Sequence, residues 1–381
     1  MRNERELRQS GSWVALDEVR DTSSFAALRE EWDGLLESSG AGVFNSWAWL
    51  YPWSRRLAPS TQLRILTARD CDGRLVGVLP LHLETVRVLG RKVRRLSFLG
   101  ERRVGSDYLD VIAARGCEVP VARAMATALR DGSGGWDVMD LLDLHEGSTT
   151  PSLFREVFRD FNVRTRVRMT CPWERFEPGE TFEAFLRRTR RRDNFLRRKK
   201  WLEKQPGYRL EVSTRPEALA RPLAEFFRLH ALRWDLEGGS SGITGPEVEA
   251  FHRDATWALA ESGKLRLYTM WIGEKAVASV YGIVHGDTFS YYQAGYDPEW
   301  RDKSVGLVLV GATFEDAMGG GLREYDFLRG TETYKSDWVS KTRSTIGVRV
   351  FASTGAGAWL DAVEQGARDV KGVLERVLPE G

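Results

Sequence analysis

The chain has 381 residues, of which 42% are hydrophobic and 29% charged, and its formal net charge is +2. This length exceeds what a typical single hydrophobic core uses, so we expect two domains or two fused half-domains. The small net charge does not demand a polyanionic partner, and three widely separated cysteines predict neither a disulfide framework nor a metal site.

The first half of the chain predicts helices followed by a largely antiparallel sheet. A serine start, apolar residues at helical spacing and a glycine stop predict a helix at 23–39, and a second helix rich in aromatic residues is expected at 44–57. An Asp-Gly turn joins the expected strands 63–70 and 74–85 into a hairpin. The elements expected next are strands 95–100 and 107–113, helix 119–130 and strand 136–144.

The second half replays this order, starting from a basic helix at about 181–204. A helix at 304–318 is expected to stop at three successive glycines, which are a strong C-terminal signal. The other elements expected are strand 208–214, helices 216–234 and 246–262, strands 265–272, 276–286 and 288–296, and a core strand from residue 324.

Two segments of the chain, 63–83 and 265–285, share one outline. Each has a strand, an acidic-glycine turn and a second strand with small residues, so the sequence suggests two copies of one α+β unit. We expect the first unit at 1–175 and the second at 176–381.

The run 187–200 holds nine Lys or Arg residues in fourteen positions. These side chains could form a solvated helix face, or a platform for the phosphates of CoA, of a nucleotide-linked substrate or of tRNA. The chain shows no paired-ligand histidine spacing, no Ser-His-Asp order and no P-loop, so metal-dependent and hydrolase readings lack their usual signatures.

The start of the expected helix at 304–318 follows a polar loop with Arg301 and Lys303. A helix N-terminus presents free N–H groups and a positive dipole end, so it attracts phosphate, and Gly306 would let a ligand approach the backbone closely. The alternative is a capped helix packed on a sheet, with Gly306 present for close packing.

The stretch 324-EYDFLRGTETYKSDW-338 runs from an apolar strand into a polar turn that holds Glu332 and Lys335. The two could be a surface ion pair worth less than about 1 kcal/mol. They could also line a cleft at the sheet edge, where a lysine stabilises developing negative charge on a carbonyl. His230, near the end of an expected helix, could be a general base or a buried structural histidine.

Several of these segments together resemble a known family: 184–203, 226–234, 291–300, 304–310 and 325–338. In them the sequence is similar to the acyltransferase domain of CelD-type proteins, which belongs to the GNAT superfamily and is close to the FemAB-like aminoacyltransferases. The resemblance implies tandem GNAT-like units, each a mostly antiparallel mixed sheet flanked by helices. It also implies transfer of an acyl group from a thioester or ester donor to an amine.

The resemblance implies that the donor pyrophosphate lies against the helix that opens at Ser304. The usual GNAT phosphate loop has an Arg or Gln followed by two spaced glycines, whereas this sequence offers Arg301 and then only Gly306. FemAB-like relatives with weak phosphate loops use aminoacyl-tRNA. Two donors are therefore considered: acyl-CoA, which we place first, and aminoacyl-tRNA as the alternative.

By the same resemblance, Lys335 is expected to polarise the transferring carbonyl. Direct attack also needs a route for the proton, which Glu332, Asp326 or His230 could supply. The residues expected to hold the donor are Gln293, Ala294, Gly295, Arg301, Lys303, Ser304, Val305 and Gly306. The residues expected to hold the acceptor are Arg233, Trp234, Tyr292, Tyr296, Asp326 and Tyr334.

The leading hypothesis is an N-acyltransferase that moves an acyl group from acyl-CoA, with acetyl-CoA in first place, to an amino group of a small molecule or saccharide precursor. The alternatives are aminoacyl-tRNA-dependent transfer of a FemAB kind and a non-catalytic binding subunit of a polysaccharide system. No tightly bound cofactor and no metal are expected. The absence of an apolar N-terminal segment and of any run of eighteen apolar residues predicts a cytoplasmic protein without a membrane span.

Overall fold

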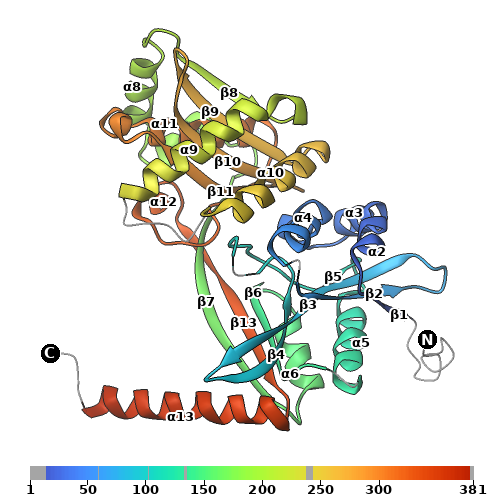
Figure 1. Ribbon diagram of the computed structural model, residues 1–381. Helices are drawn as coiled ribbons and strands as arrows, with labels where there is room; N and C mark the ends of the chain where they lie inside the picture. The colour runs from blue at the N-terminus through green and yellow to red at the C-terminus, as the bar shows by residue number, and fades with distance from the viewer. Residues whose placement is uncertain (1–13, 59, 102, 133–134, 237–242, 378–381) are drawn as a thin grey trace.

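The computed structural model describes residues 14–58, 60–101, 103–132, 135–236 and 243–377, and the side chains of all these except 234–236 and 369–377 (Figure 1). Its strands form one continuous sheet that runs through two lobes, with helices packed on the sheet in each lobe. This is the mixed α+β architecture expected from the sequence.

The N-terminal lobe holds the elements up to residue 157. They are β1 Ala15–Val19, α2 Thr22–Ala27, α3 Arg29–Ser38, α4 Trp47–Leu57, β2 Gln62–Arg69, β3 Leu75–Val88, β4 Arg91–Phe98, β5 Ile112–Ala113, α5 Glu118–Asp131, β6 Val138–His145 and α6 Thr150–Val157. Strand β1 and helix α6 were not expected. The helix expected at 23–39 is divided at Leu28, and the strand expected at 107–113 shrinks to β5.

The upper lobe in Figure 1 holds most of the second half. Its elements are α7 Phe182–Arg188, α8 Arg192–Leu202, β8 Arg209–Ser213, α9 Ala220–Leu236, α10 Pro246–Glu261, β9 Leu265–Ile272, β10 Lys275–His285, β11 Thr288–Tyr296, α11 Val305–Gly319, β12 Glu324–Asp326 and α12 Thr333–Ser336. The basic helix expected at 181–204 is two helices, because Arg190 has a left-handed backbone (φ 58°) that no continuous helix tolerates.

Two long strands that the sequence reasoning did not anticipate connect the lobes: β7 (Asn162–Arg175) and β13 (Lys341–Phe351). They pair antiparallel along their length, from Lys341 opposite Trp173 to Phe351 opposite Asn162 (Figure 1). Helix α13 (Gly355–Val377) follows β13 and packs against β13 and β4. None of the helices in the described ranges has the length and apolar character needed to cross a bilayer.

The sheet repeats one arrangement twice. Its order is β1-β2-β3-β4-β6-β13-β7-β12-β11-β10-β9-β8. In each lobe an antiparallel meander ends in a strand that pairs in parallel with the next one, β4 with β6 and β11 with β12, across an intervening helix. The matching registers place Ser97 opposite Asp140 and Ser290 opposite Asp326, so the internal repeat inferred from the hairpins extends through both lobes.

The lobes meet through helices α4 and α10 and through a buried aromatic cluster. Trp49 of α4 packs edge-on against Phe251 of α10 and against Tyr292 of β11, with ring centroids 4.9 and 5.1 Å away. His252 and Tyr281 complete the cluster, and all five side chains are at most 8% exposed. Because such rings bury large apolar areas, this contact fixes one lobe on the other.

Candidate active site

The candidate site lies where β11 and β12 separate. The two strands are paired over only three residues, from Thr288–Glu324 to Ser290–Asp326. Beyond this point β11 continues to Tyr296 while the chain leaves β12, so the sheet opens. Two adjoining cavities, of about 440 and 210 Å³, occupy the opening. Both are lined by Arg233, Tyr291, Ala294 and Tyr334.

The larger cavity ends at the N-terminus of α11. Ser304 precedes the helix in a left-handed conformation (φ 61°) and forms no side-chain cap, so the first-turn N–H groups have no capping side chain. Gly306 lines the cavity, and a Cβ at this position would meet no atom within 4 Å. Gly311, in contrast, lies against Phe195 and is required for packing. The helix start can therefore receive an anion.

The cationic side chains around this helix start differ in whether another group of the chain already contacts them. Arg191 is bound to Asp337 through its backbone oxygen at 3.0 Å and through its carboxylate. The Lys303 ammonium lies 5.5 Å from the centroid of the Trp201 ring. Arg301 lines the cavity and has no ion-pair partner within the described ranges. Arg301 is therefore the guanidinium left to bind an anionic ligand here.

Lys335 is the cation of the smaller cavity, and its side chain is only 4% exposed. Its Nζ lies 2.9 Å from Oε2 of Glu332 and donates to the backbone oxygen of Arg329 at 2.6 Å. An ammonium group has three N–H donors, so one remains for a ligand in the cavity. A cationic donor at a buried site is what a developing oxyanion requires.

Arg329 anchors the loop that carries Lys335 onto the N-terminal lobe. Its backbone N–H donates to Asp107 at 2.9 Å, and its guanidinium contacts the carboxylates of Asp107 at 2.7 Å and of Asp143 at 3.0 Å. Asp107 is fully buried, and burial raises the pKa of its carboxyl while the Arg329 charge opposes this. Asp107 and Gly105 also line the smaller cavity, so both lobes build it.

Three residues near Arg329, one in its own loop and two in the first lobe, have an unusual backbone. Leu328, Tyr108 and Asp143 all have left-handed conformations, with φ of 56°, 61° and 61°. Such conformations are costly for residues other than glycine and persist where the surroundings enforce them. Here the N–H of Leu328 donates to Asp326 at 2.7 Å, which holds the turn that leads to Lys335.

Buried tyrosines and Arg233 form the wall between the two cavities. Burial raises the pKa of Tyr291 to about 12 and that of Tyr334 well above its usual value, and the two hydroxyls are hydrogen-bonded to each other. Arg233 lies over the rings of Tyr334 and Tyr296 at 5.7 and 5.9 Å. Both hydroxyls are therefore neutral hydrogen-bonding groups at physiological pH.

The structure brings most of the residues suggested by the sequence to these two cavities. The lining includes Arg233, Tyr292, Gln293, Ala294, Gly295, Tyr296, Arg301, Gly306, Glu332, Tyr334 and Lys335. Other suggested residues do not line either cavity: His230, Lys303, Ser304, Val305 and Asp326. The side chain of Trp234 lies outside the described residues.

His230 lies behind β11, on α9. It is 2% exposed, and its backbone would be 2.3 Å from a Cβ at Gly295, so Gly295 allows α9 to pack on the strand. Burial lowers the pKa of His230 to about 4, and a hydrogen bond with Gln293 opposes this shift. His230 thus contacts the cavity lining through Gln293. Asp326 faces the opposite side and binds Arg343.

Sequence reasoning missed Asp107 and Arg329. The two are separated by 222 positions and become neighbours only when the lobes associate. The basic run that holds Arg191 was expected to be a platform for phosphates, but nothing in that run distinguishes Arg191 from its neighbours before folding.

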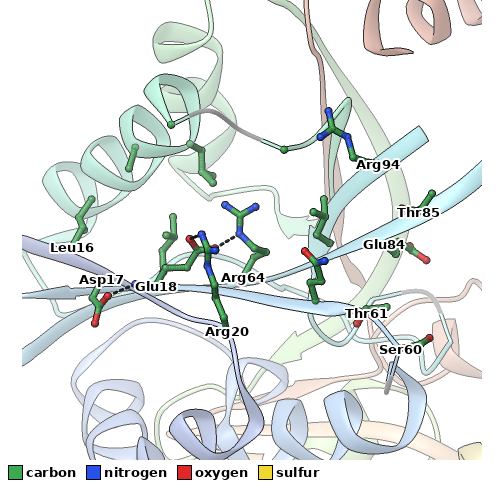
Figure 2. Close-up of a pocket in the computed structure, with 17 residues that line it drawn as sticks. Leu16, Asp17, Glu18, Arg20, Ser60, Thr61, Arg64, Glu84, Thr85 and Arg94 are labelled. Carbon is green, nitrogen blue, oxygen red and sulfur yellow. Dashed lines mark hydrogen bonds and ion pairs between the residues drawn. The ribbon is translucent and has the colours of Figure 1, made fainter. Parts of the chain in front are cut away.

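A cavity of about 1000 Å³ lies elsewhere, along β1 to β4 of the N-terminal lobe. Figure 2 shows Glu18 and Arg64 side by side in the lining of this cavity as an ion pair, and Arg20 also binds Glu18, at 2.7 Å. Arg94 is bound to Asp137 at 2.9 Å. These charges are paired within the chain, and no residue suggested by the sequence lines this cavity.

One group in the described ranges could hold a metal ion. His82, Glu84 and Glu101 each offer a ligand atom, and these atoms lie within 4.8 Å of one another. Glu84 is bound to Arg95 at 2.9 Å, and this guanidinium would compete with a metal ion for the carboxylate. None of the three residues lines the two cavities at β11, which contain no comparable ligand set.

Part of the second lobe is similar in sequence to a known family. Residues 189–336 match the model of a family described as an acetyltransferase (GNAT) domain. This range includes α8, α11 and the loop with Lys335, and therefore most of the residues that line both cavities. No curated protein sequence matches the chain.

Several solved structures share the fold over most of the chain. FemX is similar with a TM-score of 0.60 at 12% identity, over 84% of this chain and 95% of that chain. The C-terminal domain of a putative lysylphosphatidylglycerol synthetase from Agrobacterium fabrum gives 0.52 at 10% identity, over 90% and 96%. L-PGS from Bacillus licheniformis gives 0.51 at 13% identity, over 88% and 96%. Identities this low establish a shared fold alone.

Proposed function

We propose that this chain, a GNAT-superfamily protein of the FemAB-like group, transfers an acyl group from acyl-CoA, with acetyl-CoA in first place, to an amino group of a small molecule or saccharide precursor. The observation that carries the proposal is the pair of joined cavities. One ends at the α11 N-terminus with Arg301, which forms no ion pair with any described residue, and the other holds the buried ammonium of Lys335. A phosphate-bearing donor thus has an anion site at one end and a carbonyl-polarising group at the other.

The donor would lie with its phosphates at Arg301 and Gly306 and with its acyl carbonyl at Lys335. The amine attacks the carbonyl carbon, a C–N bond forms, and the free N–H of Lys335 donates to the oxyanion. The C–S bond then breaks, Glu332 accepts the proton of the amine, and the departing thiolate is protonated. Glu332 suits this role because it contacts Lys335 and is 40% exposed.

The donor half of the proposal is tested by ligand-induced stabilisation. Saturating acetyl-CoA or CoA should raise the melting temperature, because a ligand at about one hundred times its Kd stabilises the folded state by about 2.7 kcal/mol. Arg301→Ala should weaken binding about tenfold by removing a charged contact. Arg166→Ala, an exposed arginine on β7, is the matched control. Absence of any shift with both ligands would count against CoA as donor.

The chemical half is tested at Lys335. Lys335→Met should lower kcat about 10²- to 10³-fold with little change in CoA affinity, because the side chain contacts the carbonyl and not the phosphates. The readout is acetyl transfer to a panel of amines, beside the melting temperature of the variant. Full activity in a folded Lys335→Met protein would refute the assignment.

Aminoacyl-tRNA is the second candidate donor, and one observation favours it. Lys200 and Arg197 on α8 are exposed, and neither forms an ion pair within the described ranges. The basic run is less positive than its sequence suggests, however, since Arg192 binds Glu183 and Asp193. Salt-sensitive retention of tRNA that is lost in Arg197→Ala/Lys200→Ala would select this donor. If neither donor binds, that result would favour the alternative of a non-catalytic binding subunit.

A further inference from the structure

A separate cavity of about 300 Å³ lies between the two lobes, on the other side of the β11–β12 pairing. Residues 39–44 of the first lobe, the β10–β11 turn and the start of β12 enclose it. It shares no lining residue with the two cavities at Lys335. The peptide between Asp107 and Tyr108 separates them, because Asp107 lines the acyl-transfer side and Tyr108 lines this one.

We call this space the junction cavity. The charged side chains of its inner wall already bind one another. Arg343 contacts Glu324 and Asp326, both at 2.5 Å, and donates to the hydroxyl of Tyr108 at 3.2 Å. Glu324 and Asp326 are 8% and 1% exposed. Glu324 also contacts Arg175 at 3.5 Å, so two guanidinium groups face the two carboxylates and ligand recognition is left to other groups of the cavity.

A serine hydroxyl of the cavity lining is available to a ligand. Ser290 is 8% exposed and lines the cavity, and its hydroxyl forms no hydrogen bond with any described residue. This hydroxyl can donate to or accept from a polar ligand in the cavity. His145 and His285 lie nearby, and burial lowers the pKa of both imidazoles, so both are neutral and polar.

The rim carries two unpaired charges of opposite sign. Arg115 follows β5 in the first lobe, and Asp287 lies in the β10–β11 turn of the second lobe. Both are exposed, and neither has an ion-pair partner in the part of the chain that the structure describes. A ligand with a carboxylate and an ammonium would pair with both, whereas a singly charged ligand would leave one unmatched.

We propose that the junction cavity is a second binding site and that it takes a small zwitterion with a polar side chain, of the α-amino acid class. Arg115 binds its carboxylate, Asp287 its ammonium group, and Ser290 a polar side chain. A cavity of about 300 Å³ is at the small end of ligand sites in proteins. Because the two charged contacts come from different lobes, the ligand also links the lobes.

The test uses the full chain and L-serine as the probe. Calorimetric titration should give saturable binding at one site, and the melting temperature should rise with L-serine concentration. L-Serinamide lacks the carboxylate and N-acetyl-L-serine lacks the ammonium group, so each should bind about tenfold more weakly or worse. No saturable binding of L-serine, or equal binding of all three compounds, would overturn the proposal.

Charge variants assign the two ends of the ligand. Arg115→Ala should weaken L-serine about tenfold and leave L-serinamide unchanged, because that analogue has no carboxylate to lose. Asp287→Asn should weaken L-serine similarly and leave N-acetyl-L-serine unchanged. The matched controls are Arg166→Ala and Glu217→Gln, which change exposed residues outside the cavity. Equal effects of the rim variants and the controls would overturn the assignment, and melting without ligand confirms that each variant is folded.

Discussion

His252 shows how a single residue can make the stability of the whole chain depend on pH. It is fully buried among Trp49, Phe251, Tyr281 and Tyr292, and neither ring nitrogen has a hydrogen-bond partner among the described residues. Burial lowers its pKa to about 3, so the folded chain holds a neutral imidazole. In the unfolded chain the same imidazole takes up a proton below about pH 6.5.

The expected result is a loss of stability in acid that His252 causes. Since the folded-state pKa is depressed, its contribution is complete above pH 6.5 and is lost as the pH falls toward 3. Between pH 7 and pH 5 this amounts to about 2 kcal/mol. His252→Phe should remove that share, measured as the difference between the urea unfolding free energies of the two proteins at the two pH values. Equal pH dependence in both proteins would refute it.

At the scale of single residues, the sequence predicted most of the side chains that line the two cavities. It did not show which of them are buried or bound to other groups of the chain. Lys335 and Arg301 were named from a turn after an apolar strand and from a helix start, which are local features. Burial of Lys335 beside Glu332 and the unpaired state of Arg301 are properties of the folded chain. His230 was named for its chemistry, but its burial behind β11 depends on how α9 packs.

Among the elements, α11 has two glycines with different purposes. A Cβ on Gly311 would lie 2.2 Å from the ring of Phe195 and 3.0 Å from that of Trp338, so close packing of α11 on α8 depends on it. A Cβ on Gly306 would meet nothing within 4 Å and would project toward the larger cavity. The sequence left open whether Gly306 serves close approach of a ligand or close packing. The structure shows that Gly311 is the glycine that packing requires.

Alanine at each position should separate the two purposes. Gly311→Ala should lower the unfolding free energy by about 1–3 kcal/mol, because a buried ring must move. Gly306→Ala should leave it unchanged or raise it by up to about 1 kcal/mol, through higher helix propensity. If the donor phosphates lie on α11, Gly306→Ala should also weaken CoA binding. Chemical denaturation and CoA titration check both, and similar stability losses in the two variants would contradict the assignment.

Helices and hairpins with strong local patterns were found from the sequence, and β7 and β13 were not. Strand β7 alternates valines with arginines, but Val163 and Val167 are not buried and most of its other side chains are exposed or half-buried. A strand with little buried surface shows a weak hydrophobic period. Its partner β13 supplies most of its pairing, and that contact joins segments far apart in the chain.

On the scale of the whole molecule, the ion pair between Arg329 and Asp107 connects the two lobes at the site. The side chain of Asp107 is 0% exposed, and that of Asp143 is 3% exposed. Arg168 also binds Asp143, at 2.9 Å. Removing Arg329 would therefore leave Asp107 as the buried carboxylate without a counter-charge, which costs far more than loss of a surface pair.

Arg329→Met should accordingly destabilise the chain by about 3–5 kcal/mol. The double variant Arg329→Met/Asp107→Leu should recover a large part of this loss, because it removes the uncompensated charge as well. The measurement is urea unfolding of the wild type, both single variants and the double variant. Strictly additive effects would show that the pair does not act as a unit.

The division into units 1–175 and 176–381 stays a prediction, and strand pairing gives it a specific form. Strand β7 ends at Arg175 and pairs with β12 of the second lobe, whereas β13 pairs with β6 of the first lobe. We propose that the two units exchange these strands, each completing the sheet of the other. Neither half would then fold with a closed sheet by itself.

The sequence by itself determined the α+β class and the repeated hairpins, and it named the helix at 304–318 and Lys335 as candidates for the two ends of a donor site. Each of these depends on residues within about one element of each other, where periodicity, turn residues and capping act directly. Tertiary structure alone decided the pairing of β7 with β12 and of β13 with β6, the anchoring of the Lys335 loop through Arg329 to Asp107, and the junction cavity. These features arise from contacts between the two halves of the chain, and no local pattern specifies which distant partner a strand or a buried charge will meet.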